Sequence, residues 1–128
     1  MDQPSKHDIF KTGEDLATKY LISNGYRLVC RNFRTRSGEI DIIVETDQHL
    51  IFVEVKTRTF HSIETALASV SYTKQKKISK TAQEYINLNE QYGNHIFRFD
   101  VIVVFRYAST NTYSIHHLED AFYPIIDE

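Results

Sequence analysis

The chain has 128 residues, of which 41% are hydrophobic and 25% are charged, and its formal net charge is −2. This length and composition are ordinary for a soluble globular protein, so we expect one domain over residues 1–128. The apolar runs are too short for a membrane-spanning segment, and the single cysteine excludes an internal disulfide and a cysteine-based zinc site. The start of the chain has no apolar signal-peptide core, so we expect a cytoplasmic protein with no membrane partner.

The first half of the chain predicts one helix followed by three strands. Apolar side chains recur with the 3.6-residue period of a helix over 8–24, and Asn24-Gly25 is typical of a helix end. Runs rich in β-branched and aromatic residues predict strands at 26–33, 39–45 and 50–58, separated by polar turns.

The second half predicts a long helix and a strand that is apolar on both faces. We expect, in order, a loop at 60–73 with a short helix at 64–70, a long helix at 73–91, strands at 96–107 and 113–117, and a closing helical turn at 118–123. A strand that is apolar on both faces is typical of the centre of a sheet. The order αβββαββ therefore predicts an α/β fold with a central mixed β-sheet flanked by helices.

Three charged residues interrupt the most apolar strands: Asp41 in the second, and Glu54 and Lys56 in the third. Buried charges are rare unless they are paired or bind a metal. Strand side chains alternate between faces, so a hairpin would place these three next to one another on one side. Neighbouring carboxylates suit Mg²⁺ or Mn²⁺, and the lysine could orient or activate a water molecule. The alternative is a Glu54–Lys56 ion pair at the surface of an edge strand.

The first helix supplies a further candidate carboxylate, Glu14. On a helical projection it lies at the edge of the apolar face, near Phe10 and Ala17. Gly13 lies at the centre of that face, where the missing side chain allows close contact with a sheet. A carboxylate at this boundary could reach the same site. The alternative is a rim residue whose carboxylate extends into solvent.

Basic residues are concentrated in the middle of the chain. Residues 27–80 contain ten Lys/Arg and six Asp/Glu and sum to +4, whereas 1–26 sum to −1 and 81–128 to −5. A basic middle that contains the candidate site suits a surface that faces phosphates. The alternative is that the lysines only solvate one face of a helix.

The long helix divides its polar residues between two faces. Lys74 and Gln75 lie on the apolar stripe one turn before Ile78, so we expect them to point into the site or along its rim. Three lysines lie on the opposite face, where we expect solvated charges: Lys76, Lys77 and Lys80. Asp100, which begins the strong strand, is more typical of a strand-entry contact than of a site residue.

In these residues the chain resembles the YraN-like family of bacterial proteins, which belongs to the PD-(D/E)XK restriction-endonuclease-like superfamily. The resemblance covers nearly the whole chain and depends on an ordered set of motifs: Thr12-Gly13-Glu14-Asp15-Leu16-Ala17, Asn24-Gly25-Tyr26, Arg31-Asn32-Phe33-Arg34, Gly38-Glu39-Ile40-Asp41, Phe52-Val53-Glu54-Val55-Lys56-Thr57-Arg58, Lys74-Gln75, Arg98-Phe99-Asp100-Val101 and His117-Leu118-Glu119-Asp120-Ala121-Phe122. One departure is the loop at 57–62, which lacks the glycine that is often found there.

The resemblance implies a restriction-endonuclease-like fold with a divalent-metal site. It implies that Asp41, Glu54 and the Val55 carbonyl oxygen bind the metal. Glu14 would be the accessory acid of the first helix, and Lys56 would be the catalytic lysine. The arrangement is similar to that of archaeal Holliday junction resolvases, which makes branched DNA a candidate substrate.

Two functions of different classes remain open. The first is a Mg²⁺- or Mn²⁺-dependent endonuclease that hydrolyses phosphodiester bonds in DNA, including branched or structured DNA, and that works as a monomer or a homodimer. Five residues would contact phosphates: Arg34, Arg36, Arg58, Lys74 and Gln75. The second is a non-catalytic nucleic-acid-binding or adaptor module that keeps the fold as a scaffold. The intact acids and lysine favour the enzyme, whereas the negative net charge favours the module.

Overall fold

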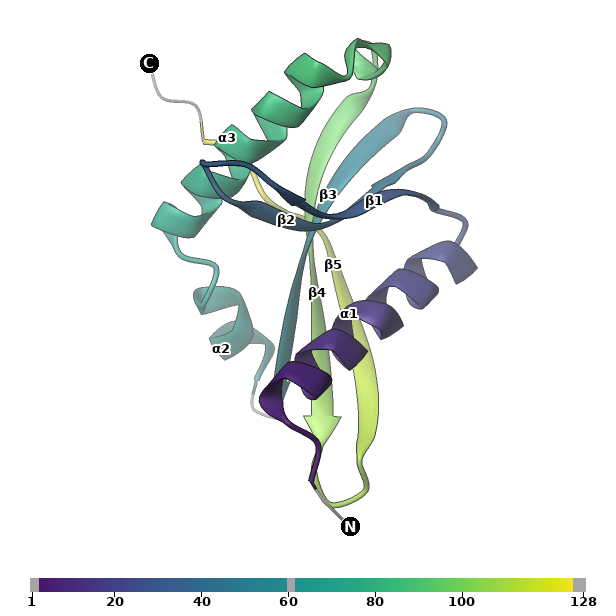
Figure 1. Cartoon of the computed structure of the whole chain (residues 1–128), viewed down its shortest axis with the longest axis vertical. Coiled ribbons are helices and arrows are strands. Elements are labelled where there is room, and N and C mark those ends of the chain that lie inside the picture. The colour runs from purple at the N-terminus through teal and green to yellow at the C-terminus, as the bar shows by residue number, and fades with distance from the viewer. Residues whose placement is uncertain (1–2, 60–61, 126–128) are drawn as a thin grey trace.

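The computed structural model describes residues 3–59 and 62–125 of the chain (Figure 1). In chain order its elements are α1 (Lys6–Ser23), β1 (Arg27–Arg34), β2 (Glu39–Glu45), β3 (His49–Thr59), α2 (Ile63–Ala68), α3 (Tyr72–Leu88), the 3-10 helix η1 (Glu90–Tyr92), β4 (Ile96–Tyr107) and β5 (Thr112–Phe122). The bounds of β2 and β4 are those predicted from the sequence. No described helix is both long and apolar enough to cross a membrane.

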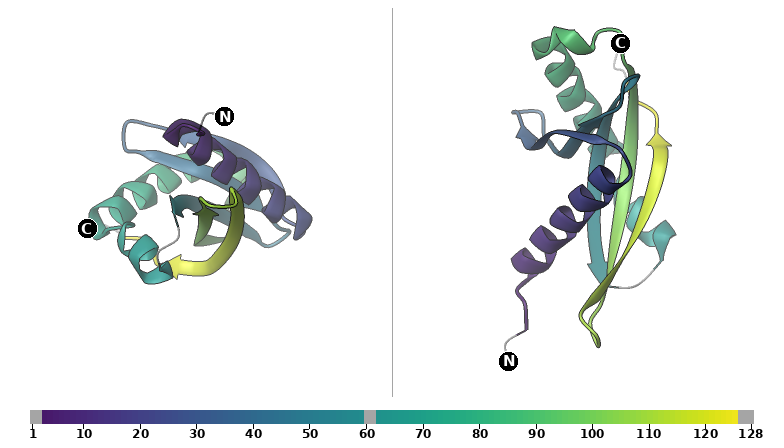
Figure 2. Two further views of the ribbon diagram at one scale, coloured as in Figure 1. Left: turned by 90° about the horizontal axis from the view of Figure 1, so that it is seen from below. Right: turned by 90° about the vertical axis from the view of Figure 1, so that its right-hand side faces the viewer.

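The described strands form one mixed sheet in the order β1-β2-β3-β4-β5. β3 and β4 run parallel, and the other neighbouring pairs are antiparallel. α1 covers one face of the sheet, and α2 and α3 cover the other, as the view from below in Figure 2 shows. The predicted α/β class is confirmed, because an open five-stranded sheet flanked by helices is consistent with a restriction-endonuclease-like fold.

β3 is buried on both faces because it lies between the two helical layers. Val53 packs in one apolar cluster with Ala17 and Leu21 of α1. Phe52, the preceding residue, packs in the other cluster with Ile78 of α3. Full burial of an apolar side chain of this size stabilises the fold by about 1.5–3 kcal/mol. The strand that carries the candidate site is therefore also a main support of the core.

α1 is capped at both ends and pressed against β3 in its middle. The Ser5 hydroxyl accepts a hydrogen bond from the backbone N–H of the third helical residue at 3.0 Å. Gly25, with φ +90°, ends the helix in the left-handed conformation, as its sequence predicts. A side chain at Gly13 would overlap Thr57 of β3, which confirms the predicted close contact. This contact holds Glu14 against the sheet.

The β1–β2 hairpin leaves β3 and turns toward α3. The paired ladder between β2 and β3 ends at Ile42 and Val53. Beyond that pair the hairpin reaches across the sheet to α3 (Figure 1), where the Ser37 hydroxyl donates a hydrogen bond to the Glu84 carboxylate. The strong right-handed twist of two-stranded ribbons accounts for this change of direction. A gap therefore opens between β2 and β3 beyond the last pair.

The predicted closing helical turn at 118–123 is wrong, because β5 continues as a strand to Phe122. The register of β5 with β4 shifts between Leu118 and Phe122, so the strand contains a bulge. Asp120, with φ +52°, lies in this bulge. Leu118, Ala121 and Phe122 all pack against the core. Their spacing of three and four residues is that of a helix face, but here the bulge brings them to the same side of a strand.

Candidate functional site

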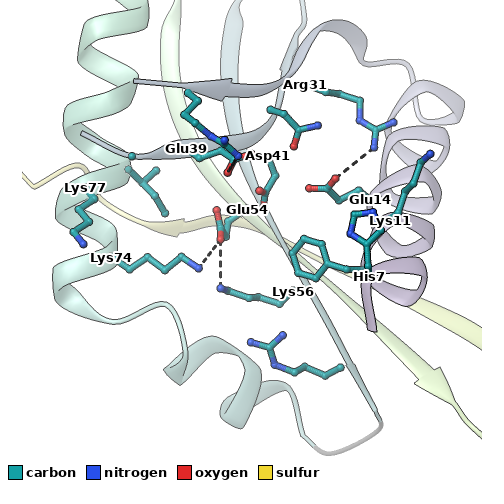
Figure 3. Close-up of a pocket in the computed structure, with 16 residues that line it drawn as sticks. His7, Lys11, Glu14, Arg31, Glu39, Asp41, Glu54, Lys56, Lys74 and Lys77 are labelled. Atoms are coloured by element: carbon teal, nitrogen blue, oxygen red, sulfur yellow. Dashed lines mark hydrogen bonds and ion pairs between the residues drawn. The ribbon is translucent and has the colours of Figure 1, made fainter. Parts of the chain in front are cut away.

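A cleft of about 740 Å³ opens over β3, between α1 and α3, where β2 separates from β3 (Figure 3). Among the described residues that line it, seven are Lys or Arg and four are Asp or Glu, a net of +3. These residues are Lys11, Arg31, Arg34, Lys56, Arg58, Lys74 and Lys77, and Glu14, Glu39, Asp41 and Glu54. Since the whole chain carries −2, positive charge is concentrated around this cleft.

Asp41 and Glu54 lie at the base of the cleft, one residue beyond Ile42 and Val53, the last β2–β3 pair. Both are nearly buried, with exposed fractions of 8% and 7%. Asp41 Oδ2 accepts a hydrogen bond from the Val55 N–H at 2.7 Å. The carboxylate thus pairs with a backbone N–H of β3 that lies beyond the last β2–β3 pair. This bond directs Asp41 toward β3 and hence toward Glu54.

Asp41 and Glu54 form a pair of neighbouring buried carboxyl groups. Burial raises the pKa of the Asp41 carboxyl to about 8, and the charge of Glu54 contributes to the increase. The hydrogen bond from the Val55 N–H acts in the opposite direction. Two carboxylates so close together both ionise readily only when a positive charge lies beside them. The pair is therefore a favourable place for a cation.

Two lysine ammonium groups contact the same oxygen of Glu54. The distances from Glu54 Oε1 are 3.3 Å to Lys56 Nζ and 2.9 Å to Lys74 Nζ. Burial, helped by the nearby Lys74, lowers the pKa of Lys56 to about 8. Burial also lowers the pKa of Lys74, but hydrogen bonds with Lys56 and Glu54 outweigh it and raise this pKa overall. β3 is an internal strand and Lys56 is 6% exposed, so the alternative of a surface ion pair on an edge strand is wrong.

Glu14 lines the cleft from the α1 side, across from α3 (Figure 3). It is 8% exposed, and its Oε2 lies 3.6 Å from Arg31 Nη2. Arg31 Nη1 also donates to Asp15 Oδ1 at 2.9 Å. Burial raises the pKa of Glu14, and the charge of Arg31 partly offsets this effect. Glu14 is therefore a buried cleft residue and not a rim residue that extends into solvent.

The carboxylates of the cleft do not form a complete metal site by themselves. Within residues 3–59 and 62–125, no three His, Cys, Asp or Glu side chains lie close enough together to hold a metal ion. Asp41 and Glu54 are neighbours, whereas Glu14 is held by Arg31 on the α1 side. A Mg²⁺ ion is commonly bound by one or two carboxylates together with waters and substrate phosphate oxygens. Two carboxylates are thus the protein ligands that this cleft offers most directly.

The five residues predicted to contact phosphates do not all lie in the cleft. Arg34, Arg58 and Lys74 line it. Arg36 lies beside a neighbouring groove on the other side of the hairpin turn. Gln75 donates a side-chain hydrogen bond, at 2.9 Å, to a backbone carbonyl between α2 and α3. Gln75 therefore fixes the start of α3, where Lys74 is located.

Several cleft residues were not predicted as site residues, among them Lys77, His7, Lys11 and Arg31. Lys77 is exposed, as predicted, but it lines the cleft because the hairpin turn lies against it, so the prediction that it lies on the face away from the site is wrong. His7 and Lys11 also line the cleft, seven and three residues before Glu14. That spacing is one helix face, so the sequence contained a signal for both. Arg31 reaches Glu14 only through the packing of β1 against α1.

A second polar cluster lies away from the cleft, around Asp100 of β4. Asp100 is completely buried and accepts hydrogen bonds from Arg98 Nε and Nη2 (both 2.8 Å), His117 Nε2 (2.7 Å) and the Asp120 N–H (3.0 Å). The Tyr20 hydroxyl of α1 lies 3.1 Å from His117 Nδ1. Burial raises the pKa of Asp100, but the bonds from His117 and Arg98 outweigh it and lower the pKa overall. Asp100 thus connects β4, β5 and α1, which fits the predicted strand contact.

The loop that departs from the family pattern is described only in part. Thr59 ends β3, and Phe60 and His61 lie outside the described residues. Ser62 is the N-cap of α2: its hydroxyl accepts a hydrogen bond from the Thr65 N–H at 3.1 Å. The short helix predicted at 64–70 corresponds to α2.

Comparison with known proteins gives one consistent result. The sequence model of a family described as "Uncharacterised protein family UPF0102" matches residues 13–104, a span that contains the main cleft residues. A UPF0102 protein of Clostridium novyi (strain NT) is 43% identical over 110 residues, which cover 86% of this chain and 91% of that protein. UPF0102 proteins of Caldicellulosiruptor bescii and Clostridium botulinum (strain 657 / Type Ba4) are each 40% identical, over 86% and 90% of this chain and 92% and 94% of their own length.

Proposed function

Since this chain belongs to the uncharacterised protein family UPF0102, the YraN-like family, we infer its function from the residues of the cleft. We propose that the protein is a metal-dependent endonuclease of the PD-(D/E)XK type that hydrolyses phosphodiester bonds in DNA. The observation that carries this proposal is the burial of Asp41, Glu54 and Lys56 together at the base of a positively charged cleft. Buried charges of this kind destabilise a fold unless they have partners, so their presence favours a role in binding and catalysis.

The donor groups of the cleft fit a hard divalent cation. Asp41 and Glu54 would hold one Mg²⁺ or Mn²⁺ ion, with the Val55 carbonyl oxygen and Glu14 as the further ligands implied by the resemblance. The raised pKa of Asp41 supports this assignment, because it reflects a buried carboxyl pair that needs more positive charge. When bound, such an ion supplies charge that stabilises the phosphate and lowers the pKa of a water molecule.

Lys56 would act on the attacking water. In hydrolysis the water oxygen forms a bond to phosphorus, the bond from phosphorus to one ester oxygen breaks, and the released oxygen takes a proton. The pKa of Lys56, lowered to about 8 by burial, allows its amino group to hold or release a proton near neutral pH. Its contact with Glu54 at 3.3 Å would keep it beside the reacting group.

The basic lining of the cleft suits a nucleic acid backbone. Arg34 of β1, Arg58 of β3 and Lys74 of α3 would contact phosphates in the cleft, and Arg36 would extend this surface beyond the hairpin turn. Gln75 would act indirectly, by positioning the first turn of α3. The resemblance to junction resolvases makes branched or structured DNA the proposed substrate. Two cuts across such a substrate need two clefts, so we propose a homodimer on it.

A non-catalytic nucleic-acid-binding or adaptor module is the second candidate. The observation in its favour is that the ammonium groups of Lys56 and Lys74 both form ion pairs with Glu54. A cleft balanced in this way could bind phosphates through its remaining basic residues without any metal. The two candidates differ in whether divalent cations are required.

The first prediction tests cleavage directly. Labelled single-stranded, duplex, flap and four-way-junction DNA, and RNA, are incubated with Mg²⁺, Mn²⁺ or EDTA and either the wild type or Glu54→Gln. We expect metal-dependent DNA cleavage by the wild type and a loss of at least about 100-fold in the variant, because a neutral amide binds hard cations poorly. Circular dichroism checks that the variant is folded. DNA binding without cleavage by the wild type would favour the module.

A further inference from the structure

We infer that Lys74 is an internal counter-ion that occupies Glu54 until a divalent cation binds, and that it then moves to a phosphate of the nucleic acid. The inference rests on the proposed function, because it assumes a cation at Asp41 and Glu54. It adds a coupling between two ligands: cation binding would prepare the cleft for the nucleic acid, and the nucleic acid would tighten cation binding.

The geometry places both lysines on one oxygen of Glu54, as the two dashed lines in Figure 3 show. Lys74 makes the shorter contact, 2.9 Å from Nζ to Oε1, against 3.3 Å for Lys56. An oxygen that already has two ammonium neighbours cannot also receive a divalent cation without strong repulsion among the positive charges. A cation on this carboxylate would therefore bind most favourably if one of the lysines withdrew from Oε1.

Lys74 is the lysine that can withdraw. Its side chain is 40% exposed, whereas the side chains of Lys56 and Glu54 are each 7% exposed. Lys56 lies on β3 two residues after Glu54, so its position is restricted by the sheet. Lys74 lies in the first turn of α3, which Ser71 caps, and its long side chain crosses the open cleft to reach Glu54. Rotation of this side chain alone would carry its ammonium group back to the cleft opening.

The released ammonium group would remain useful because it stays in the cleft. Lys74 lines the same wall as Lys77, one turn further along α3. A phosphate held above Asp41 and Glu54 would face this wall, so Lys74 would exchange one anionic partner for another. Cation binding would thus cost less when the nucleic acid is present, which is the physical origin of the coupling.

Mn²⁺ binding in the absence of nucleic acid tests the inference without any measure of activity. Free Mn²⁺ is measured by electron paramagnetic resonance for the wild type, Lys74→Met, Lys77→Met and Glu54→Gln. Lys77→Met is the matched control, because it removes the same charge from the same wall of the cleft. Of these two lysines, only Lys74 has a described contact with Glu54. Lys74 is partly exposed, so its replacement should leave the fold intact.

We expect Lys74→Met to bind Mn²⁺ about tenfold more tightly than the wild type, because the variant has no charge-assisted hydrogen bond to break when the cation binds. The Mn²⁺ affinity of Lys77→Met should stay within about twofold of the wild-type value. Glu54→Gln should abolish the binding. If Lys74→Met and Lys77→Met change the affinity equally, the role of Lys74 as counter-ion is overturned while the metal site stands. If neither the wild type nor Lys74→Met binds Mn²⁺, the proposed metal-dependent function itself is overturned.

Discussion

At the scale of single residues, the cleft contains carboxyl groups with very different partners. Glu54 faces two ammonium groups at 3.3 and 2.9 Å. Asp41 has instead a backbone N–H, from Val55, and this neutral partner does not compensate for its burial beside Glu54. Asp41 therefore destabilises the metal-free protein when it ionises, although the proposed reaction requires it. A residue of this kind is kept for the reaction although it lowers the stability of the fold.

A second prediction follows for the stability of the metal-free protein. Burial raises the pKa of Asp41 from 3.8 to about 8, so folding takes up a proton between these pH values and wild-type stability falls as the pH rises through this range. Asn takes up no proton and keeps an oxygen for the Val55 N–H. We expect Asp41→Asn to be more stable than the wild type by about 1–3 kcal/mol near pH 7.5, and not near pH 4.

Urea unfolding in EDTA at the two pH values measures this difference. The variant should at the same time lose Mn²⁺ binding, because it lacks one of the two neighbouring carboxylates. A gain in stability that is equal at both pH values would show that the pKa of Asp41 is not the cause.

At the scale of the elements, the cleft depends on two features: α1 lies very close to β3, and the β1–β2 hairpin separates from β3. α1 touches β3 at Gly13, where there is no side chain to separate them, and this contact brings Glu14 into the cleft. On the other side, β2 stops pairing with β3 at Ile42 and turns toward α3. One contact is closer than usual in a helix–sheet packing and one pairing is interrupted. Together they leave a cleft open over the candidate site on β3.

The third prediction concerns the contact between α1 and β3. Gly13→Ala would improve the helix propensity of α1 by about 1 kcal/mol, but its methyl group would overlap Thr57. Overpacking of this kind costs about 1–3 kcal/mol, so we expect a net loss of stability. Thermal unfolding measures the loss. Gly13→Ala combined with Thr57→Ala should recover part of it, and equal losses in the single and double variants would exclude this clash as the cause.

At the scale of the whole molecule, two polar clusters have different tasks. The cleft over β3 keeps an opening and a net positive lining, which suits a charged ligand. The cluster around Asp100 is closed: its carboxylate is completely buried, and both oxygens accept hydrogen bonds from neighbouring elements. It connects the end of α1 to β4 and to the bulge of β5. The first cluster would bind the ligand and the second holds the fold together.

The fourth prediction separates these two tasks. Asp100→Asn leaves Arg98 and His117 without their carboxylate partner, so we expect a loss of about 3 kcal/mol in the free energy of unfolding at pH 7. The wild-type advantage should shrink at low pH, because the lowered pKa of Asp100 means that its stabilisation is lost as the carboxylate is protonated. Urea unfolding measures both effects, and Mn²⁺ affinity should not change.

Asp120→Asn is the matched control for this prediction. Asp120 is exposed, contributes its backbone N–H to Asp100 and has φ +52°, a conformation that asparagine tolerates well. We expect its stability to remain within about 0.5 kcal/mol of the wild type. A similar loss in both variants would mean that net charge, and not the buried network, determines the effect.

The sequence by itself determined the features that depend on local periodicity. The bounds of β2 and β4 followed from their apolar runs, and the helix face of α1 placed Gly13 against the sheet. Strand alternation brought Glu54 and Lys56 to one side, with Asp41 opposite on the neighbouring strand. These predictions succeeded because the directions of neighbouring side chains are set by backbone geometry, which repeats every two residues in a strand and every 3.6 in a helix.

Only the tertiary structure decided the features that depend on twist, bulges and packing between distant segments. Ile40 packs with Ile43 on the α3 side, against strict alternation, because the hairpin twists away from β3. The bulge in β5 changed an apparent helix face into a strand. Lys77 entered the cleft because the hairpin turn covers α3, and Lys74 reached Glu54 across the cleft. No local period encodes these contacts, since each depends on where separate elements come to lie in the folded chain.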